Sequence, residues 1–409
     1  MAEIRPLRAI HYAPGVALDD VVAPPYDVID DEQRAALLRR SPHNVVEIDL
    51  PRGDDPYGHA AEVLERWLAD GVLVRDDEPA IWVLTQEYTD PDGARRTRSG
   101  FFAAVRVTDY GPGRIRPHER THPGPKEDRL RLTRATRANP SPIFSLYSDP
   151  QERAWAALEP ATREAPYGET TEPDGTVDRL WRVADPDVVA TVTAALADAE
   201  LLIADGHHRY ETARVYAQEA GTDEAGWVLM CLVALEDPGL TVFPTHRLVR
   251  GRGLERYEAL AGVLREHFAI EEVGEDELAP PPGDGPLELG YVDSHFKRPF
   301  RLTLRGEPDT GLEGPLARLD AAVLEALLLK GVLGLTDEDI SHLNDFGYAR
   351  DRRQALELVT SGAFDVAFLL RPTPVSQVRE VAASGASMPP KSTYFFPKVP
   401  TGLLFNPLD

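Results

Sequence analysis

The spacing of hydrophobic and polar residues predicts alternating helices and strands over the N-terminal part of the chain. The apolar run Val45–Leu50 predicts a short strand, whereas Tyr57–Asp70 has Ala61, Leu64 and Leu68 at helical spacing and predicts an amphipathic helix. Two β-like runs, Ala80–Tyr88 and Gly100–Val107, flank the turn sequence DPDG at positions 90–93. Turn residues of this kind between two such runs predict a β-hairpin.

The same alternation continues to the C-terminus. Leu201–Arg214 predicts a strand, a sharp polar turn and the start of a helix, and Val228–Leu235 predicts a buried strand. The C-terminal part is predicted to alternate helices at Leu254–His267, Leu316–Lys330 and Arg352–Ser361 with strands at Leu287–Val292 and Val366–Leu370. The fold class expected from these elements is α/β (α+β).

Composition limits the classes of function that are expected. The 409 residues carry 44 Lys and Arg against 68 Asp and Glu, which gives a formal net charge of −24. This charge opposes binding to nucleic acid backbones and to anionic lipid. The most hydrophobic run, Trp227–Leu235, is far shorter than the roughly 20 residues that span a bilayer, so no membrane segment is expected. The N-terminus lacks the apolar stretch of a signal peptide, which makes the chain's expected location cytoplasmic.

The single cysteine, Cys231, lies inside that hydrophobic run. One cysteine cannot close an intramolecular disulfide, and a thiol among apolar residues behaves as a small hydrophobic group. We therefore expect Cys231 to be buried and structural.

The segment Gly111–Pro142 has a charge balance opposite to that of the whole chain. Its acidic residues are Glu119, Glu127 and Asp128. Eight basic residues give it a net charge of +5: Arg114, Arg116, Arg120, Lys126, Arg129, Arg131, Arg134 and Arg137. Such a run is consistent with a solvated helix face, or with a local anion site that attracts a phosphorylated ligand.

The turn Asp205–Arg209 (DGHHR) joins the predicted strand to the predicted helix. Gly206 allows a ligand to approach the backbone, the helix N-terminus attracts anions, and Arg209 supplies a planar fork of donors. His207 and His208 could donate to phosphate oxygens, and Asp205 could hold Mg²⁺ or orient a histidine. The alternative is a structural turn with one buried and one solvated imidazole.

The sequence HERTH at positions 118–122 has the spacing of a zinc peptidase helix, with His118 and His122 as ligands and Glu119 as a base. Proline precedes and follows this sequence, so a continuous helix is not expected and zinc is not the expected ligand. The alternative is a loop that presents Glu119 beside the basic segment. A carboxylate there could accept a hydroxyl proton during phosphoryl transfer.

A third candidate lies near the C-terminus, in the sequence PKST at positions 390–393. Lys391, Ser392 and Thr393 could hold the carboxylate or phosphate of a substrate, although any surface loop can have this composition. Arg120 and Lys126 of the basic segment are further candidate substrate-binding residues.

Several sequence blocks resemble the domain-of-unknown-function family numbered 1015 over essentially the whole chain. These blocks are VVAPPYDVI (21–29), the stretch 116–149 that begins RPHERTH, LLIADGHHRYETA (201–213), FPTHRLV (243–249) and MPPKSTYFFPKVPTGLLFNPL (388–408). Three landmarks also occur in the same order as in the free-serine kinases of the ParB/sulfiredoxin superfamily: Pro117–Glu119, Asp205–Arg209 and Pro390–Thr393. That resemblance implies a ParB/sulfiredoxin-like nucleotide-binding core in which Glu119 is the catalytic base, the turn binds nucleotide phosphates and the last landmark binds serine.

Two departures from the kinase pattern stand out. The 85 residues between Glu119 and Asp205 form a much longer gap than the kinases have, and residues 1–110 have no counterpart in them. Sulfiredoxin places a reactive cysteine in this turn, whereas Cys231 lies elsewhere, so a sulfiredoxin-type reductase is excluded.

These inferences predict an N-terminal α/β domain at 1–110, a ParB/sulfiredoxin-like phosphate-binding core at 111–250 and a C-terminal α/β substrate lobe at 251–409. The predicted function is a nucleotide-dependent phosphotransferase that interconverts serine and phosphoserine, using ADP or ATP with Mg²⁺. Glu119, His118 and Asp205 are the predicted catalytic residues. A phosphoserine phosphatase-like hydrolase and a ParB-like nucleotide-binding switch remain alternatives.

Overall fold

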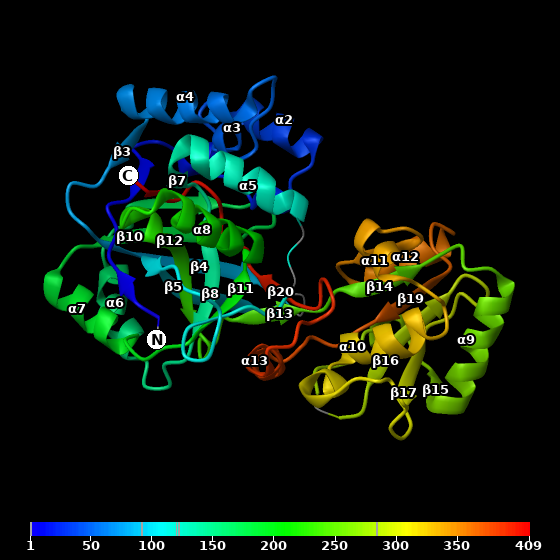
Figure 1. Cartoon of the computed structure of the whole chain (residues 1–409). Coiled ribbons are helices and arrows are strands. Elements are labelled where there is room, and N and C mark those ends of the chain that lie inside the picture. Colours follow the sequence, from blue (N-terminus) through cyan, green and yellow to red (C-terminus); the bar gives the residue numbers. More distant parts are fainter. Residues whose placement is uncertain (1, 91–92, 120, 122, 284) are drawn as a thin grey trace. The chain divides into compact units, whose positions relative to one another are not determined.

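The computed structural model describes residues 2–90, 93–119, 121, 123–283 and 285–409. The described part contains thirteen α-helices and a large mixed sheet, so the expected α/β class is confirmed (Figure 1). The chain divides into two compact units. The first unit comprises Met1–Pro117, Thr121–Thr241 and Pro397–Asp409, and the second comprises His118–Arg120 and Val242–Phe396. The division into domains at 1–110, 111–250 and 251–409, which we expect from the sequence, remains a prediction.

The first unit is built on a nine-stranded mixed sheet with the order β6-β11-β8-β12-β5-β4-β10-β9, in which β1 also pairs with β5. Its strands are β1 (Ile4–Arg5), β4 (Ile81–Thr89), β5 (Arg95–Arg106), β6 (Ile115–Arg116), β8 (Ile143–Tyr147), β9 (Gly168–Thr171), β10 (Val177–Val183), β11 (Leu201–Asp205) and β12 (Trp227–Ala234). β12 runs parallel to β8 and antiparallel to β5. Two small two-stranded sheets add β2 (Ile10–Tyr12) with β3 (Leu73–Arg75), and β7 (Ala138–Asn139) with β21 (Asn406–Pro407).

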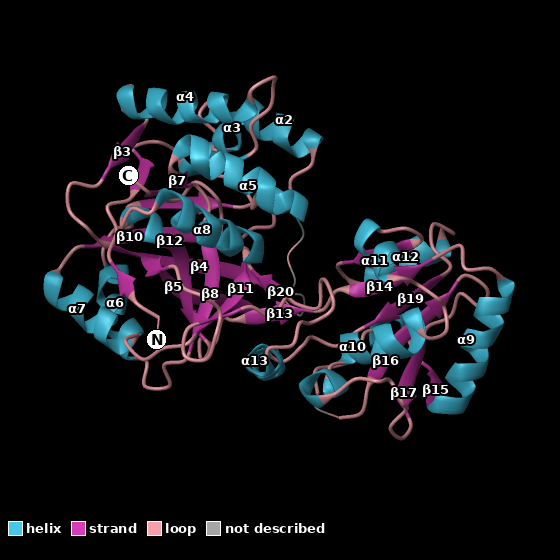
Figure 2. Ribbon diagram, in the orientation of Figure 1, coloured by secondary structure: helices cyan, strands magenta, loops and turns pink. Residues whose placement is uncertain are grey.

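Helices accompany this sheet in two groups (Figure 2). The helices of the first unit are α1 (Leu18–Val21), α2 (Asp31–Arg40), α3 (Val46–Asp49), α4 (Pro56–Ala69), α5 (Pro123–Thr136), α6 (Arg153–Leu158), α7 (Pro186–Ala195) and α8 (His207–Ala220). α6 packs against α7, whereas α4, α5 and α8 lie side by side.

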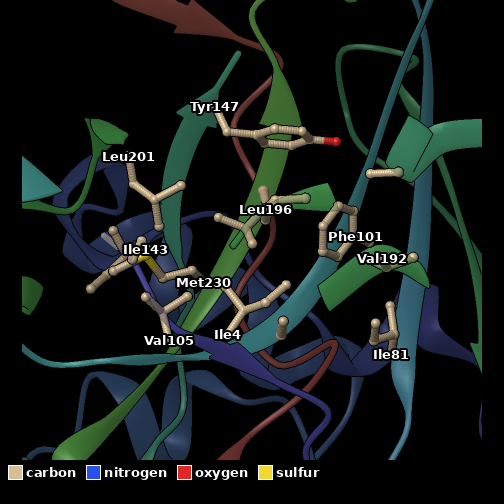
Figure 3. Close-up of a cluster of buried hydrophobic side chains, with 14 of the residues drawn as sticks. Ile4, Ile81, Phe101, Val105, Ile143, Tyr147, Val192, Leu196, Leu201 and Met230 are labelled. Atoms are coloured by element: carbon tan, nitrogen blue, oxygen red, sulfur yellow. The ribbon is translucent and has the colours of Figure 1, made fainter. Parts of the chain in front are cut away.

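The main core of the first unit lies where the sheet meets α6 and α7 (Figure 3). Ile81, Phe101 and Met230 of three strands and Val192 of α7 belong to this cluster, and all four side chains are fully buried. Complete burial of side chains of this size contributes roughly 1.5–3 kcal/mol each.

The amphipathic helix predicted at Tyr57–Asp70 is confirmed as α4. Asp55 caps its N-terminus by accepting a hydrogen bond from the Gly58 N–H at 3.1 Å, and Pro56 occupies the first helical position. The buried residues Ala60, Val63, Leu64 and Trp67 follow helical spacing. The packed stripe is therefore turned by one position from the stripe of Ala61, Leu64 and Leu68 that the sequence suggested.

The strand predicted at Val45–Leu50 is wrong, because this segment forms the short helix α3. The side chain of the fully buried Asn44 fixes the turn: its Nδ2 donates to the Asp20 and Val22 carbonyls, and its Oδ1 accepts from the Val46 N–H at 3.2 Å. Tertiary hydrogen bonds thus override the β propensity of Val45, Val46 and Ile48.

The other elements predicted for the first unit are confirmed. β4 and β5 form the predicted hairpin, with Gly93 at a φ of 83° in its turn. β11 and α8 form the predicted strand and helix on either side of DGHHR, and β12 forms the predicted buried strand. Cys231, in β12, is buried as expected.

The second unit contains a six-stranded sheet with the order β15-β17-β16-β19-β14-β18. Its strands are β14 (His246–Val249), β15 (Phe268–Glu272), β16 (Glu288–Asp293), β17 (Phe300–Leu304), β18 (Phe346–Ala349) and β19 (Val366–Leu369), and the separate strands β13 (Thr241–Phe243) and β20 (Tyr394–Phe396) pair with each other. Its helices are α9 (Leu254–His267), α10 (Asp320–Leu324), α11 (Asp337–His342), α12 (Arg352–Thr360) and α13 (Val375–Ser384).

Most predicted elements of the second unit are confirmed as α9, α12, β16 and β19. The single helix predicted at Leu316–Lys330 is wrong, because this stretch divides into a 3₁₀ turn, α10 and a π-helical segment. No helix in the described part of the chain is long and apolar enough to cross a membrane.

Candidate functional site

The turn between β11 and α8 has a backbone that favours glycine. Gly206 has a φ of 96° and is the N-cap residue of α8. This left-handed conformation is strained for any residue with a Cβ. Because a glycine N-cap contributes no capping side chain, the positive end of the α8 dipole faces the turn without a protein carboxylate or hydroxyl from this position.

Asp205, at the end of β11, pairs with two cations. Its Oδ2 accepts from Arg209 Nη2 at 2.7 Å, and its Oδ1 accepts from Lys398 Nζ at 3.0 Å. Burial alone would raise the pKa of Asp205, but Lys398 and Arg209 outweigh burial and hold this pKa well below its usual range. Asp205 is therefore a carboxylate at neutral pH, with both oxygens engaged by cations.

Arg209 is also held by the two residues just before β8. Its Nη1 donates to Ser141 Oγ at 2.8 Å and to the Pro142 carbonyl, and its side chain is only 10% exposed. Its Nε is buried and has no hydrogen-bond partner among the described residues. A Cβ on Gly206 would lie 2.9 Å from this Nε, so the unpartnered donor lies directly against the glycine of the turn.

The two histidines of the turn have different environments. His207 is 4% exposed, whereas His208 is partly exposed. Burial lowers the pKa of His207 to about 4, although the Asp205 carboxylate opposes the shift. His207 is therefore neutral at pH 7, and it can act as a hydrogen-bonding group there but not as a cation.

The proline-rich segment 21–29 contributes Tyr26 to the surroundings of Arg209. The Arg129 guanidinium lies 4.3 Å from the centre of the Tyr26 ring, and Arg129 Nη1 donates to Asp49 Oδ1 at 3.0 Å. Burial raises the pKa of Tyr26 to about 12, against the opposing charges of Arg209 and Arg129. The charge of Arg209 likewise acts on the buried Asp49, whose pKa is raised by burial. Arg209 of the candidate phosphate-binding turn therefore has two further buried ionisable groups in its surroundings, Arg129 and Asp49.

The middle of the predicted basic segment forms α5. Lys126 lies in its first half, and the Lys126 carbonyl accepts from Thr212 Oγ1 of α8 at 3.3 Å. Several of its arginines are paired with acids: Arg129 with Asp49 and Asp128, Arg131 with Glu127, and Arg134 with Glu219. Much of the positive charge on α5 is therefore compensated by salt bridges.

A second group of predicted residues comes together inside the second unit. His118 Nε2 and Thr393 Oγ1 are 3.0 Å apart, and the His118 carbonyl accepts from the Met388 N–H at 2.8 Å. Glu119 Oε1 accepts from the Lys391 N–H at 3.5 Å. The PHE and PKST landmarks, separated by about 270 residues, are thus neighbours in the fold.

The backbone of the PKST sequence is held by a buried arginine that the sequence analysis did not identify. Arg247, in β14, is 2% exposed and donates to the carbonyls of Pro390 and Lys391, each at 3.1 Å. Its guanidinium also lies 5.0 Å from the centre of the Tyr348 ring. Lys391 has a φ of 56°, a left-handed conformation that these contacts hold in place.

The hydroxyls of the PKST sequence differ in their availability. Ser392 Oγ donates to the Pro389 carbonyl at 2.6 Å, and Ser392 is 7% exposed, so this hydroxyl has a structural contact. Thr393 is partly exposed and lies against His118, whereas Lys391 is exposed. Lys391 and Thr393 are therefore better placed than Ser392 to contact a substrate.

Among the residues that the structure describes, the candidate metal ligands do not come together. The described residues contain no group of three or more His, Cys, Asp or Glu side chains that could hold a metal ion. Both oxygens of Asp205 are engaged by cations, so the chemistry of this carboxylate does not fit a magnesium ligand. Arg120 and His122 lie outside the described residues, and α5 begins only at Pro123, so His118 and Glu119 precede the helix.

Comparisons with known proteins give one sequence match and several structural ones. A family model described as "Protein of unknown function (DUF1015)" matches residues 4–357. No curated protein matches the chain. Among solved structures, a mutant of free serine kinase in complex with AMP has a TM-score of 0.37 and 14% identity, over 71% of this chain and 89% of that one.

Two other solved structures are similar at the same level. A conserved hypothetical protein from Pyrococcus furiosus has a TM-score of 0.35 and 15% identity, over 71% of this chain and 92% of that one. SbnI with C-terminal truncation from Staphylococcus aureus has a TM-score of 0.37 and 13% identity, over 75% of this chain and 87% of that one.

Proposed function

The chain belongs to the family described as protein of unknown function (DUF1015), and we propose that it is a phosphotransferase that moves phosphate between a nucleotide and free serine or a similar hydroxy amino acid. The observation that carries this proposal is the turn at Asp205–Arg209, where two cations share one carboxylate beside a helix N-terminus. Such an arrangement favours a phosphate group.

In this proposal the first unit binds the nucleotide. The backbone of Gly206 and the first turn of α8 accept the phosphates, with Arg209 and the partly exposed His208 as charged or hydrogen-bonding partners. The neutral His207 contributes a hydrogen bond but no charge. The strand, turn and helix that carry these residues also support the finer fold assignment, a ParB/sulfiredoxin-like core, which the sequence resemblance implies.

The second unit supplies the residues that act on the hydroxyl substrate. Glu119 accepts the proton of the substrate hydroxyl as that oxygen attacks the terminal phosphorus of the nucleotide. The new phosphate ester forms as the bond from that phosphorus to the bridging oxygen breaks, and the nucleotide leaves one phosphate shorter, with the electron pair of that bond on its terminal phosphate oxygen. The proton remains on the Glu119 carboxyl. His118 and Thr393 form a hydrogen-bonded pair next to it, and the exposed ammonium of Lys391 attracts the substrate's carboxylate or phosphate.

ADP or ATP is the nucleotide that the resemblance implies, and Mg²⁺ is proposed to arrive bound to it. Mg²⁺ on a nucleotide neutralises phosphate charge during transfer. Asp205 does not hold the ion in this proposal, because its two oxygens are bound to Lys398 and Arg209. Catalysis by this chain then comes mainly from positioning the two substrates and from the Glu119 base.

Replacement of Glu119 by Gln tests the proposal. The variant keeps the side-chain shape but cannot accept a proton, so we expect phosphoserine formation to fall by about 100-fold or more while ADP affinity stays unchanged. Phosphoserine is measured by chromatography and ADP affinity by calorimetry. Glu357→Gln, which changes an exposed residue of α12, is the control and should keep full turnover. A fully active Glu119→Gln protein would remove the assigned base.

A further inference from the structure

Lys398 belongs to the last segment of the first unit, Pro397–Asp409. The backbone there is fixed on both sides of the lysine. Gln86 Nε2 of β4 donates to the Lys398 carbonyl at 2.9 Å, and Thr401 forms a two-hydrogen-bond bridge with Ala23, at 2.8 and 3.1 Å. The position of this side chain is therefore set by the sheet and by the segment 21–29.

The Lys398 side chain is directed to the turn and is largely removed from solvent. It is 15% exposed, and its Nζ lies 3.0 Å from Asp205 Oδ1. An ammonium carries a full positive charge and donates through N–H groups, so it can bind the oxygen atoms of an anionic ligand. A lysine on the surface far from any ligand would be expected to keep its ammonium in water.

The Asp205 carboxylate bonds to both Arg209 and Lys398, so two cations meet at this turn. The N-terminus of α8 adds the positive end of its dipole at the same place. Independently, Arg209 is nine-tenths buried, and its Nε lies against Gly206 without a hydrogen-bond partner in the described part of the chain. Buried donors are almost always satisfied, so a missing acceptor at this place points to an anionic ligand.

From this geometry we infer that Lys398 binds the phosphate chain of a nucleoside di- or triphosphate, and that Asp205 is a positioning residue that holds Lys398 and Arg209 ready for it. The inference rests on the proposed function and adds a ligand-binding residue to it. Asp205 acts through the two cations, which explains why its carboxylate is engaged on both oxygens.

The test compares Lys398→Met with Lys398→Arg and with Lys297→Met, which removes the same charge from a residue of the second unit. Calorimetry is done with ADP and, separately, with inorganic pyrophosphate. We expect Lys398→Met to weaken both affinities by about 10- to 100-fold, because a charge-assisted hydrogen bond is lost. Lys398→Arg should recover most of the loss, and Lys297→Met should bind both ligands as the parent chain does.

Thermal melting of the ligand-free proteins separates binding from folding. If Lys398→Met melts at a much lower temperature, Lys398→Gln, which keeps a donor for Asp205, replaces it in the same titrations. Equal affinity of the Lys398 variants and the parent chain for both ligands would overturn the inference, as would a parent chain that binds neither. A parent chain that binds ADP through Lys398 but forms no phosphoserine would support this inference while refuting the serine kinase proposal.

Discussion

At the scale of single residues, the least expected finding is the role of Arg247. This arginine is almost fully buried, and burial lowers its pKa, with the nearby Tyr348 and Glu325 opposing the shift. Its guanidinium donates hydrogen bonds to the backbone carbonyls of Thr245, Pro390 and Lys391. The planar fork of an arginine can hold several carbonyls at once, which an ammonium cannot do in the same geometry. Arg247 therefore fixes the loop that carries Lys391.

Replacement of Arg247 by Lys should loosen this loop while keeping the charge. We expect the KM for serine to rise by about 10-fold and kcat to fall, with ADP affinity unchanged, because Arg247 and the nucleotide-binding turn belong to different units. Steady-state kinetics with serine and calorimetry with ADP measure the two effects. Arg250→Lys, at a half-exposed residue of the same unit, is the control. An unchanged KM would show that the loop does not need the arginine fork.

At the scale of elements, the sequence predicted those parts whose signals are local. The helical spacing of apolar residues predicted α4, and the turn residues predicted the β4–β5 hairpin. The helix α3 could not be predicted, because the buried side chain of Asn44 creates it through contacts to Asp20 and Val22. The pairing of Lys398 with Asp205, 193 residues apart, depends likewise on the path of the whole chain. Among the candidate site residues, the turn was therefore recognisable from sequence, whereas its partner lysine and Arg247 were not.

The turn before α8 gives a prediction at this scale. Gly206→Ala and Gly221→Ala replace glycines at the two ends of α8, each with a positive φ, and each should lower the free energy of unfolding by about 1 kcal/mol. Only the Cβ at position 206 meets a neighbour, Arg209 Nε, whereas the Cβ at 221 meets nothing within 4 Å. We therefore expect Gly206→Ala alone to weaken ADP binding, by about 10-fold or more. Denaturant unfolding and calorimetry measure both quantities. Equal ADP affinities of the two variants would contradict the assignment of the turn to phosphate binding.

At the scale of the whole molecule, the charge is distributed unevenly. The chain carries a net charge of −24, yet two cations, Arg209 and Lys398, meet at Asp205 in the turn before α8. A long nucleic acid would meet the overall negative charge, whereas a small phosphorylated ligand meets mainly the local field. The distribution therefore favours a small phosphorylated ligand over DNA. It does not bear on a ParB-like nucleotide-binding switch that partners a protein.

The family match also bears on the whole molecule, because it ends at residue 357. Three candidate residues lie beyond this match. Lys391 and Thr393 belong to the second unit, whereas Lys398 belongs to the first. The stretch from 391 to 398 thus contributes to both groups of candidate residues, the one at the Asp205–Arg209 turn and the one at His118 and Glu119.

Phosphorus NMR of the protein with Mg²⁺ and serine, using ADP, ATP or CTP in parallel samples, shows directly whether the chain transfers phosphate to serine. We expect a phosphoserine signal to grow in at least one sample, to require serine, and to be lost with Glu119→Gln. A second series starts from phosphoserine, with and without AMP; conversion that needs AMP gives the reverse transfer, and conversion without it gives the phosphatase alternative. If the nucleotides bind but phosphoserine is neither formed in the first series nor consumed in the second, the chain is not a serine phosphotransferase.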